Sequence, residues 1–278
     1  MAKNLADTDH PDVTFVFPND GESTFATRKF KLAQWSEVFA KMFASGLESD
    51  RIIIKDITIG SFYKMIRHLN GEEITVDESN FLEMLHISRK YFLNTLTSKV
   101  YSYVQNYIVN SESILKYYPD IKKYHLTLLD NHIKRVCIRF PNEIIDNMNI
   151  NCDDHLEMLK IILESDFLCI SEFELYTKIM KMIKQTINDY TWDEVKGKLG
   201  KLIYLIRFPA MTVNELIQCA KPLSLLTVEQ IMNLQLYVME GIFTETLQLF
   251  PNIRPRINGM NQVATYNHSY TLKDLIPY

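Results

Sequence analysis

The first half of the chain combines short apolar runs with stretches of helical spacing, which predicts a mixed α and β fold. Val13–Phe17 has the composition of a strand, Ser23–Thr27 is its expected partner, and the polar residues between them favour a turn. Arg51–Lys55 is a β-branched run and is predicted to be a buried strand. From Leu32 to Ala44 the apolar residues recur every three or four positions, which predicts a helix with Phe39 and Met42 in the core. Further helices are expected over 62–69, 81–88 and 93–108.

The second half contains amphipathic helices and loses the strand pattern from about Ser111. The predicted helices span residues 111–118, 121–139, 153–164, 171–187, 192–206, 212–219 and 227–248. Several begin with a hydroxyl residue and an acid or amide three positions later, a pattern that satisfies free backbone N–H groups, at Ser171, Thr191 and Thr227. After Phe250 the prolines break the helical pattern and the sequence becomes polar, which predicts a C-terminal tail.

Composition narrows the class of protein. The 278 residues are 47% apolar with only 8 glycines and 9 prolines, which is typical of a globular, helix-rich chain of one or two domains. A net charge of -4 gives no electrostatic reason to bind nucleic acid. No apolar run resembles a signal peptide or a membrane span of roughly 20 residues, so neither is expected. The four scattered cysteines predict reduced thiols in the cytoplasm, with the nucleus as the alternative compartment.

Catalytic motifs are not found in the sequence. There is no glycine-rich phosphate loop, no Gly-x-Ser-x-Gly elbow and no His-Glu-x-x-His helix. His125, Asp130 and His132 could form one edge of a metal site, but a solvated helix face explains them more simply. We therefore expect a protein that is not an enzyme and needs no cofactor or metal.

The N-terminal pattern resembles the BTB (POZ) domain family. The run Asp12-Val-Thr-Phe-Val-Phe17 resembles the family's first strand, and the next segment matches the family at Phe25, Lys29, Leu32, Ala33, Ser36, Phe39, Met42 and Phe43. Arg28 stands where the family usually has a histidine, and the resemblance implies a local pair between Arg28 and Asp12. Ser88 and Tyr91 match a later family pattern.

The helical half resembles the BACK domain, which often follows a BTB domain. The resemblance rests on the segments 164–168 and 171–176 and on the Arg207-Phe-Pro209 turn. Together the two resemblances imply an α+β BTB domain at residues 1–110, an all-α BACK domain at residues 111–250 and a tail at residues 251–278. No kelch or PHR domain is recognisable.

The resemblance also implies a function. Such proteins are adaptors that link a target protein to a cullin-3 RING ubiquitin ligase, and the residues that would meet the cullin here are Phe43, Leu47, Glu48 and Ser49. The helices from Ser111 to Phe140 would extend that contact. The alternatives are an oligomerisation scaffold or a decoy without ligase function, and a homodimer is one of the assemblies that the family forms.

Overall fold

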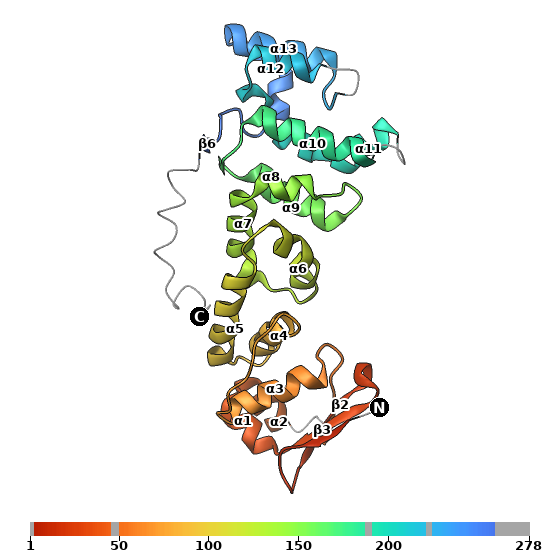
Figure 1. Ribbon diagram of the computed structural model, residues 1–278, viewed down its shortest axis with the longest axis vertical. Coiled ribbons are helices and arrows are strands. Elements are labelled where there is room, and N and C mark those ends of the chain that lie inside the picture. Colours follow the sequence, from red (N-terminus) through yellow and green to blue (C-terminus); the bar gives the residue numbers. More distant parts are fainter. Residues whose placement is uncertain (1–2, 46–49, 187–190, 221–223, 259–278) are drawn as a thin grey trace. The chain divides into compact units, whose positions relative to one another are not determined.

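The chain forms two compact units in the computed structural model, which describes residues 3–45, 50–186, 191–220 and 224–258 (Figure 1). Unit 1 comprises Met1–Ile108 and Pro119–Thr127, and unit 2 comprises Val109–Tyr118 and Leu128–Tyr278. The boundary that the sequence predicts, at residue 110, falls close to the end of the first segment of unit 1.

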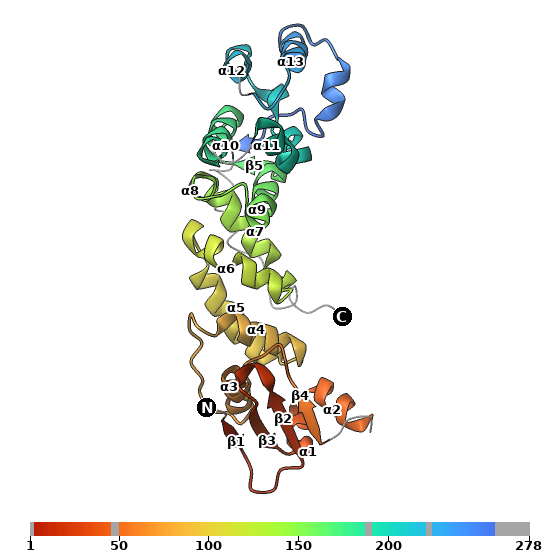
Figure 2. The same ribbon diagram turned by 90° about the vertical axis from the view of Figure 1, so that its right-hand side faces the viewer.

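Unit 1 contains a four-stranded mixed sheet with the strand order β1-β3-β2-β4 (Figure 2). Its strands are β1 (Asn4–Ala6), β2 (Val13–Phe17), β3 (Ser23–Thr27) and β4 (Arg51–Ile53). Strands β2 and β3 are antiparallel, whereas β1 runs parallel to β3 and β4 runs parallel to β2. The predicted strands at 13–17 and 23–27 are confirmed, and the third ends at Ile53. Strand β1 was not predicted, because three residues of a polar segment carry no readable alternation.

Helices accompany the sheet of unit 1: α1 (Lys29–Trp35), α2 (Glu37–Ala44), α3 (Ile59–Leu69), α4 (Phe81–Lys90) and α5 (Asn94–Tyr107). The sequence predicted one helix over 32–44, and this prediction is wrong. The structure has two helices, α1 and α2, which are separated at Ser36. Ser36 has extended dihedral angles (φ −139°, ψ 119°) and acts as the N-cap of α2. A serine hydroxyl offers the backbone an alternative to the helical hydrogen bond, which favours such a break.

An aromatic cluster joins the sheet to these helices. The ring of Phe62 on α3 lies 4.8 Å from Phe15, 5.3 Å from Phe17 and 5.6 Å from Phe25, measured between centroids. All four side chains are fully buried. Since β2 and β3 place Phe15 opposite Phe25, the two strands present their rings to the same helix. Each aromatic pair adds about 0.5–1.5 kcal/mol beyond the burial of its area.

Unit 2 is mainly helical, with α7 (Asp130–Arg139), α8 (Pro141–Asp146), α9 (Asp153–Glu164), α10 (Glu172–Thr186), α11 (Trp192–Leu199), α12 (Val213–Cys219) and α13 (Val228–Glu240). The helix predicted over 153–164 is confirmed. Two predicted helices are shorter than expected, because glycines with positive φ end them: Gly200 (φ 50°) after α11 and Gly241 (φ 71°) after α13. Short 3₁₀ turns follow both helices, at Gly200–Leu205 and Glu245–Leu249.

Helix α6 (Ser111–Lys123) contributes residues to both units and contains Pro119. The sequence predicted a break at this proline, but the helix continues through it. The chain instead leaves the helical conformation near His125, which has a φ of 50°. A 3₁₀ turn (Thr127–Leu129) then leads into α7. The residues of the helix predicted over 121–139 are therefore divided among the end of α6, the 3₁₀ turn and α7.

The segment after Phe250 belongs to unit 2 as far as the structure describes it. Strand β6 (Ile257–Asn258) pairs in parallel with β5 (Phe167–Leu168), which lies between α9 and α10. The sequence placed this segment in a tail separate from the helical domain, because a pairing of two residues leaves no periodic signal. The remainder of the predicted tail, residues 259–278, lies outside the described residues.

Candidate partner-binding surface

The surface predicted to bind a partner begins with helix α2, whose start is fixed by Ser36. The hydroxyl of Ser36 accepts the backbone N–H of Phe39 at 3.3 Å and donates to the carbonyl of Tyr91 at 2.7 Å. Ser36 is buried, so neither bond competes with solvent. One side chain thus caps α2 and ties it to the end of α4.

Phe39 anchors the same helix in the core of unit 1. Its ring stacks on Tyr91 with 4.2 Å between centroids, and Phe43 stacks on its other side at 5.9 Å. Phe39 is fully buried, which confirms its predicted core position, whereas Met42 and Phe43 are only half-buried. Phe43 therefore presents part of an aromatic ring at the surface while its inner face rests on the core.

The other three residues predicted for this surface, Leu47, Glu48 and Ser49, lie outside the described residues. On the described part of α2, Glu37 and Lys41 are highly exposed and form an ion pair at 3.7 Å one turn apart. Such an exposed pair contributes little to stability, about 0.3–0.5 kcal/mol. The helix thus offers a half-exposed aromatic residue beside charged residues that partners or solvent can reach.

The pair that the resemblance implied between Asp12 and Arg28 takes a different form. Oδ1 of Asp12 accepts the backbone N–H of Lys29 at 2.6 Å, and Nε of Arg28 donates to the carbonyl of His10 at 3.0 Å. No ion pair joins these two side chains, both of which the structure describes. Because Lys29 is the first residue of α1, the carboxylate satisfies a free N–H at the positive end of the helix.

The histidines considered for a metal site do not share a solvated face. His132 is buried within α7, which corrects the expectation of a solvent-exposed helix face, and His125 lies just before the 3₁₀ turn Thr127–Leu129. Across the described ranges, no group of three His, Cys, Asp or Glu side chains could hold a metal ion. Every helix in the described part of the chain is too short or too polar to traverse a lipid bilayer.

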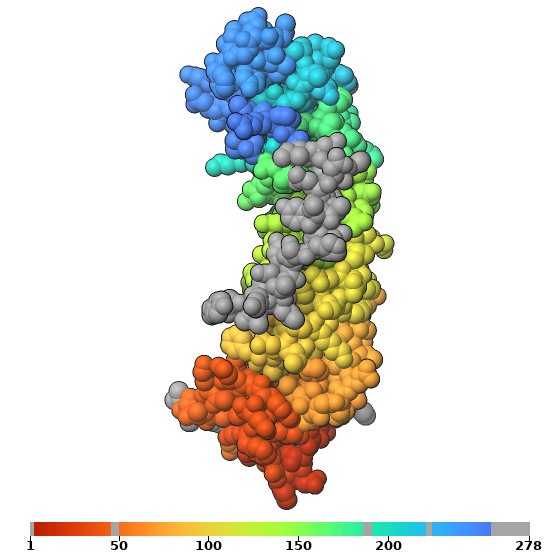
Figure 3. Space-filling view, turned by 90° about the vertical axis from the view of Figure 1, so that its left-hand side faces the viewer, coloured from red at the N-terminus to blue at the C-terminus, as the bar shows by residue number. Residues whose placement is uncertain are grey.

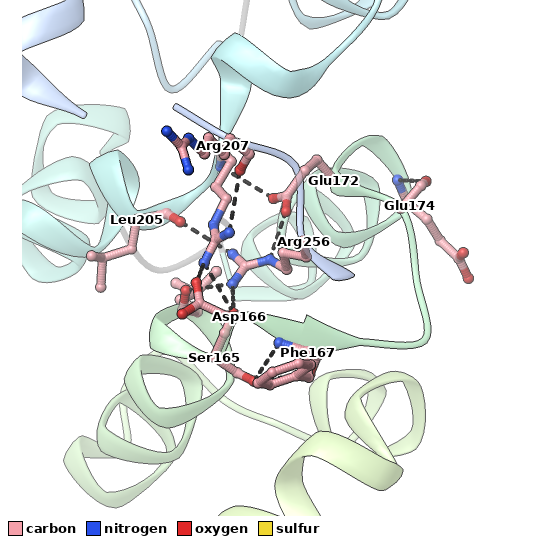
Figure 4. Close-up of polar contacts among 11 residues, drawn as sticks. Ser165, Asp166, Phe167, Glu172, Glu174, Leu205, Arg207 and Arg256 are labelled. Atoms are coloured by element: carbon pink, nitrogen blue, oxygen red, sulfur yellow. Dashed lines mark hydrogen bonds and ion pairs between the residues drawn. The ribbon is translucent and has the colours of Figure 1, made fainter. Parts of the chain in front are cut away.

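Unit 2 contains a buried polar cluster built around two arginines (Figure 4). The Arg207 side chain is 3% exposed and donates through Nη2 to the carbonyl of Ser165 at 3.2 Å and to Asp166 at 2.5 Å. Its backbone N–H donates to Oε2 of Glu172 at 3.1 Å. Arg207 therefore connects the turn before η5 (Phe208–Ala210) to the loop and helix start around β5.

The second arginine, Arg256, comes from the segment after Phe250. Its Nε lies 2.6 Å from Oε1 of Glu172, and the two side chains are 3% and 7% exposed. Its Nη atoms donate to the carbonyls of Leu163 at 2.8 Å and Leu205 at 3.2 Å, and also to that of Ser165. Burial lowers the pKa of Arg256, Glu172 opposes that shift, and the positive charge of Arg207 adds to it.

The cluster brings together the three segments on which the sequence-based expectation of a BACK domain was founded. Asp166 belongs to the first, Glu172 to the second and Arg207 to the third. The sequence did not link these segments to one another, and it missed Arg256, which stood in the predicted tail. One feature of the sequence could have indicated the role of Arg256. The run Arg254-Pro-Arg256 places two arginines in a segment with few other charges. We assign this cluster a structural role, because its polar groups are directed at one another.

The first unit is similar to a known family of domains. The sequence model of the BTB/POZ domain matches residues 2–108, which is nearly the whole first segment of unit 1. A solved structure, the BTB domain of zebrafish PATZ1, is similar with a TM-score of 0.31 and 19% identity, over 34% of this chain and 76% of that one.

Curated relatives extend the similarity beyond unit 1. BTB/POZ domain-containing protein 6 of Xenopus tropicalis is 23% identical over 233 aligned residues, covering 79% of this chain and 42% of the relative. Protein 6-B of Danio rerio is 25% identical over 229 residues, covering 79% and 46%. Protein 3 of Homo sapiens is 23% identical over 233 residues, covering 79% and 43%. The chain spans less than half the length of these relatives, and the similarity reaches into the helices of unit 2.

Proposed function

Because residues 2–108 form a BTB/POZ domain, a module that mediates contacts between proteins, we propose that this chain is an adaptor that holds a target protein on a cullin-3 RING ubiquitin ligase. The observation that carries the proposal is the match to this domain, together with similarity to BTB/POZ domain-containing proteins over 79% of the chain. An adaptor of this kind performs no chemistry. It raises the effective concentration of the target beside the ligase.

The proposed cullin contact comprises Phe43, Leu47, Glu48 and Ser49. Support comes from α2, which is held at its start by Ser36 and along its length by Phe39, so that Phe43 projects from a rigid element. A partly exposed aromatic side chain on a rigid scaffold is suited to be a binding hot spot, and an acidic residue in the contact would favour a basic partner.

Unit 2 is proposed to act as a BACK domain. The helices from Ser111 to Phe140 would extend the cullin contact, and the remaining helices would present the target. The internal order of unit 2 supports this role, because the arginine cluster connects its loops into one framework. A rigid unit 2 would hold a bound target in a defined orientation.

The test is light-scattering chromatography of the purified chain, alone and mixed with the N-terminal domain of cullin-3. We expect a stable complex at micromolar concentration that is lost in Leu47→Asp. Leu236→Glu, which replaces an exposed apolar residue of unit 2 by an acid, is the matched control and should retain the complex. Circular dichroism establishes that both variants are folded.

The outcomes separate the proposed functions. No complex with the unmodified chain would overturn the adaptor proposal and leave an oligomerisation scaffold, whose assembly state the mass of the free chain reports. A complex that survives Leu47→Asp would overturn the proposed contact residues. If the complex forms but a bound target receives no ubiquitin in a reconstituted reaction, the chain acts as a decoy.

A further inference from the structure

Helix α13 carries a stripe of exposed apolar side chains on its outer side. Val228, Met232, Leu236 and Met239 are 70%, 58%, 41% and 66% exposed. They are spaced by four, four and three residues, so they fall within an arc of about 80° on the helix. We call these four residues the α13 stripe. Helix α13, coloured blue, lies on the outside of unit 2 in Figure 3.

The stripe is not the face by which α13 packs. Ile231 and Leu234 are buried, and they point to the opposite side of the helix. The helix is also well fixed at both ends. A capping box between Thr227 and Gln230 closes its start, and Gly241 ends it in the left-handed conformation. The stripe therefore projects from a rigid helix of 13 residues, about 20 Å long.

The charged residues of the sequence segment that contains the stripe are all acidic. Between Pro222 and Ile253 the sequence has three glutamates and no lysine, arginine or histidine. All three glutamates are exposed, and Glu229 and Glu240 lie along one edge of the stripe on the helical projection, next to Leu236. An acidic border repels the anionic lipids that attract most amphipathic surface helices. It repels nucleic acid for the same reason.

We propose that the α13 stripe is a docking surface for an amphipathic helix of a partner protein, with the partner's apolar face flanked by lysine or arginine. The apolar spacing fits a second helix laid along the first, and the acidic border selects basic flanks. Two of the four contacts are methionines, whose flexible side chains adapt to partners of different shape. The proposal does not rest on the cullin contact, whose four proposed residues belong to unit 1.

The experiment uses the full chain and a designed probe. The probe is an 18-residue helical peptide with leucines along one face and lysines beside them, labelled for fluorescence anisotropy. A second peptide replaces the lysines by glutamates. We expect the lysine peptide to bind at least about tenfold more tightly than the glutamate peptide, and Leu236→Glu to weaken it by at least about tenfold. Phe30→Glu, which alters an exposed aromatic residue of unit 1, should leave binding unchanged.

Charge reversal distinguishes specific binding at the stripe from nonspecific binding of an apolar peptide. In the double variant Glu229→Lys/Glu240→Lys we expect the preference between the two peptides to reverse. Equal binding of both peptides by the unmodified chain, or binding that Leu236→Glu leaves unchanged, would overturn the proposal. So would a chain that dimerises in light scattering, becomes monomeric on Leu236→Glu and binds neither peptide, because the stripe would then receive a second copy of itself. Loss of cullin binding has no bearing on any of these results.

Discussion

Nε of Arg256 lies 2.6 Å from Oε1 of Glu172, and both side chains are almost completely removed from solvent. Glu172 opens helix α10, and Arg256 immediately precedes β6. The ion pair therefore attaches the segment after Phe250 to the body of unit 2. The other oxygen of the same carboxylate, Oε2, accepts a hydrogen bond from the backbone N–H of Arg207 at 3.1 Å.

Removing Arg256 should strongly destabilise unit 2. Arg256→Ala leaves the buried carboxylate of Glu172 without its ion-pair partner. It also removes the arginine donor from the carbonyls of Leu163 and Leu205, whereas that of Ser165 keeps its bond from Arg207. Breaking a buried pair in this way costs about 3–5 kcal/mol in the free energy of unfolding. Urea denaturation followed by circular dichroism measures the change.

Arg254→Ala is the control for that experiment. Arg254 is exposed, and its contribution to the cluster is its backbone carbonyl, which accepts from Nη1 of Arg207 and is retained in the variant. We expect a change within about 0.5 kcal/mol. If Arg254→Ala and Arg256→Ala lowered the free energy of unfolding equally, the ion pair between Arg256 and Glu172 would not be what attaches the segment after Phe250 to unit 2.

Ser36→Ala should destabilise unit 1 by about 1–3 kcal/mol. The substitution removes the N-cap of α2, and it leaves the buried carbonyl of Tyr91 without the hydroxyl that bonds it at 2.7 Å. The same denaturation assay measures the loss. Ser45→Ala serves as the comparison, because that hydroxyl bonds the carbonyl of Met42 at the exposed end of the same helix. A loss no larger than that of Ser45→Ala would contradict the role assigned to Ser36.

The four cysteines should differ in reactivity. Burial raises the pKa of Cys137 to about 12, so at pH 8 only about one thiol in ten thousand is ionised. Cys219 is also buried, whereas Cys152 and Cys169 are half-buried. We expect iodoacetamide at pH 8 to label Cys152 and Cys169 in the native chain, and Cys137 and Cys219 only after unfolding. Mass spectrometry of digests taken at successive times measures the order in which the cysteines are labelled. Early labelling of Cys137 in the native chain would contradict the prediction.

Asp146 should make the stability of unit 2 depend on pH. Lys178 at 2.7 Å, with help from Lys181 at 3.3 Å, holds the pKa of this carboxyl below its ordinary value of 3.8. The folded chain therefore binds the proton less readily than the unfolded chain. The stabilisation is complete above the ordinary pKa and disappears as the pH falls through the lowered one.

Asp146→Asn measures that contribution. At pH 7 we expect a loss of up to about 1 kcal/mol, because the carboxylate is partly exposed and solvent screens it. The difference from the unmodified chain should shrink as the pH is lowered below about 4. Glu37→Gln, in a fully exposed pair, should have almost no effect at either pH. A difference that persists unchanged at low pH would exclude the ion pairs as its cause.

The elements predicted correctly from the sequence are those whose signal is local. Val13–Phe17 and Ser23–Thr27 became strands as predicted, and 153–164 became a helix. The capping boxes predicted at Thr191 and Thr227 are also present. Each depends on periodicity or on hydrogen bonds between residues three positions apart, so neighbouring residues suffice to specify it.

The candidate surface was predictable only in part. Its aromatic core, with Phe39 at the centre, follows from helical spacing, and the buried side chain confirms it. The separation of α1 from α2 does not follow from spacing, because Ser36 also bonds the carbonyl of Tyr91, the residue that follows α4 and lies far away in the sequence. The ion pair expected between Asp12 and Arg28 is likewise absent, because each of these side chains forms a hydrogen bond with a backbone group instead.

By itself, the sequence determined most of the strands and helices and the character of the two halves, because these depend on spacing along the chain. Its motifs carried the resemblance to the BTB family. The tertiary structure alone decided that β1 joins β3, that β6 joins β5 and that Arg256 meets Glu172. These contacts join segments far apart in the sequence. A short strand or a single arginine acquires its partner only when the chain folds, since its free energy comes from burial and pairing that no local pattern encodes.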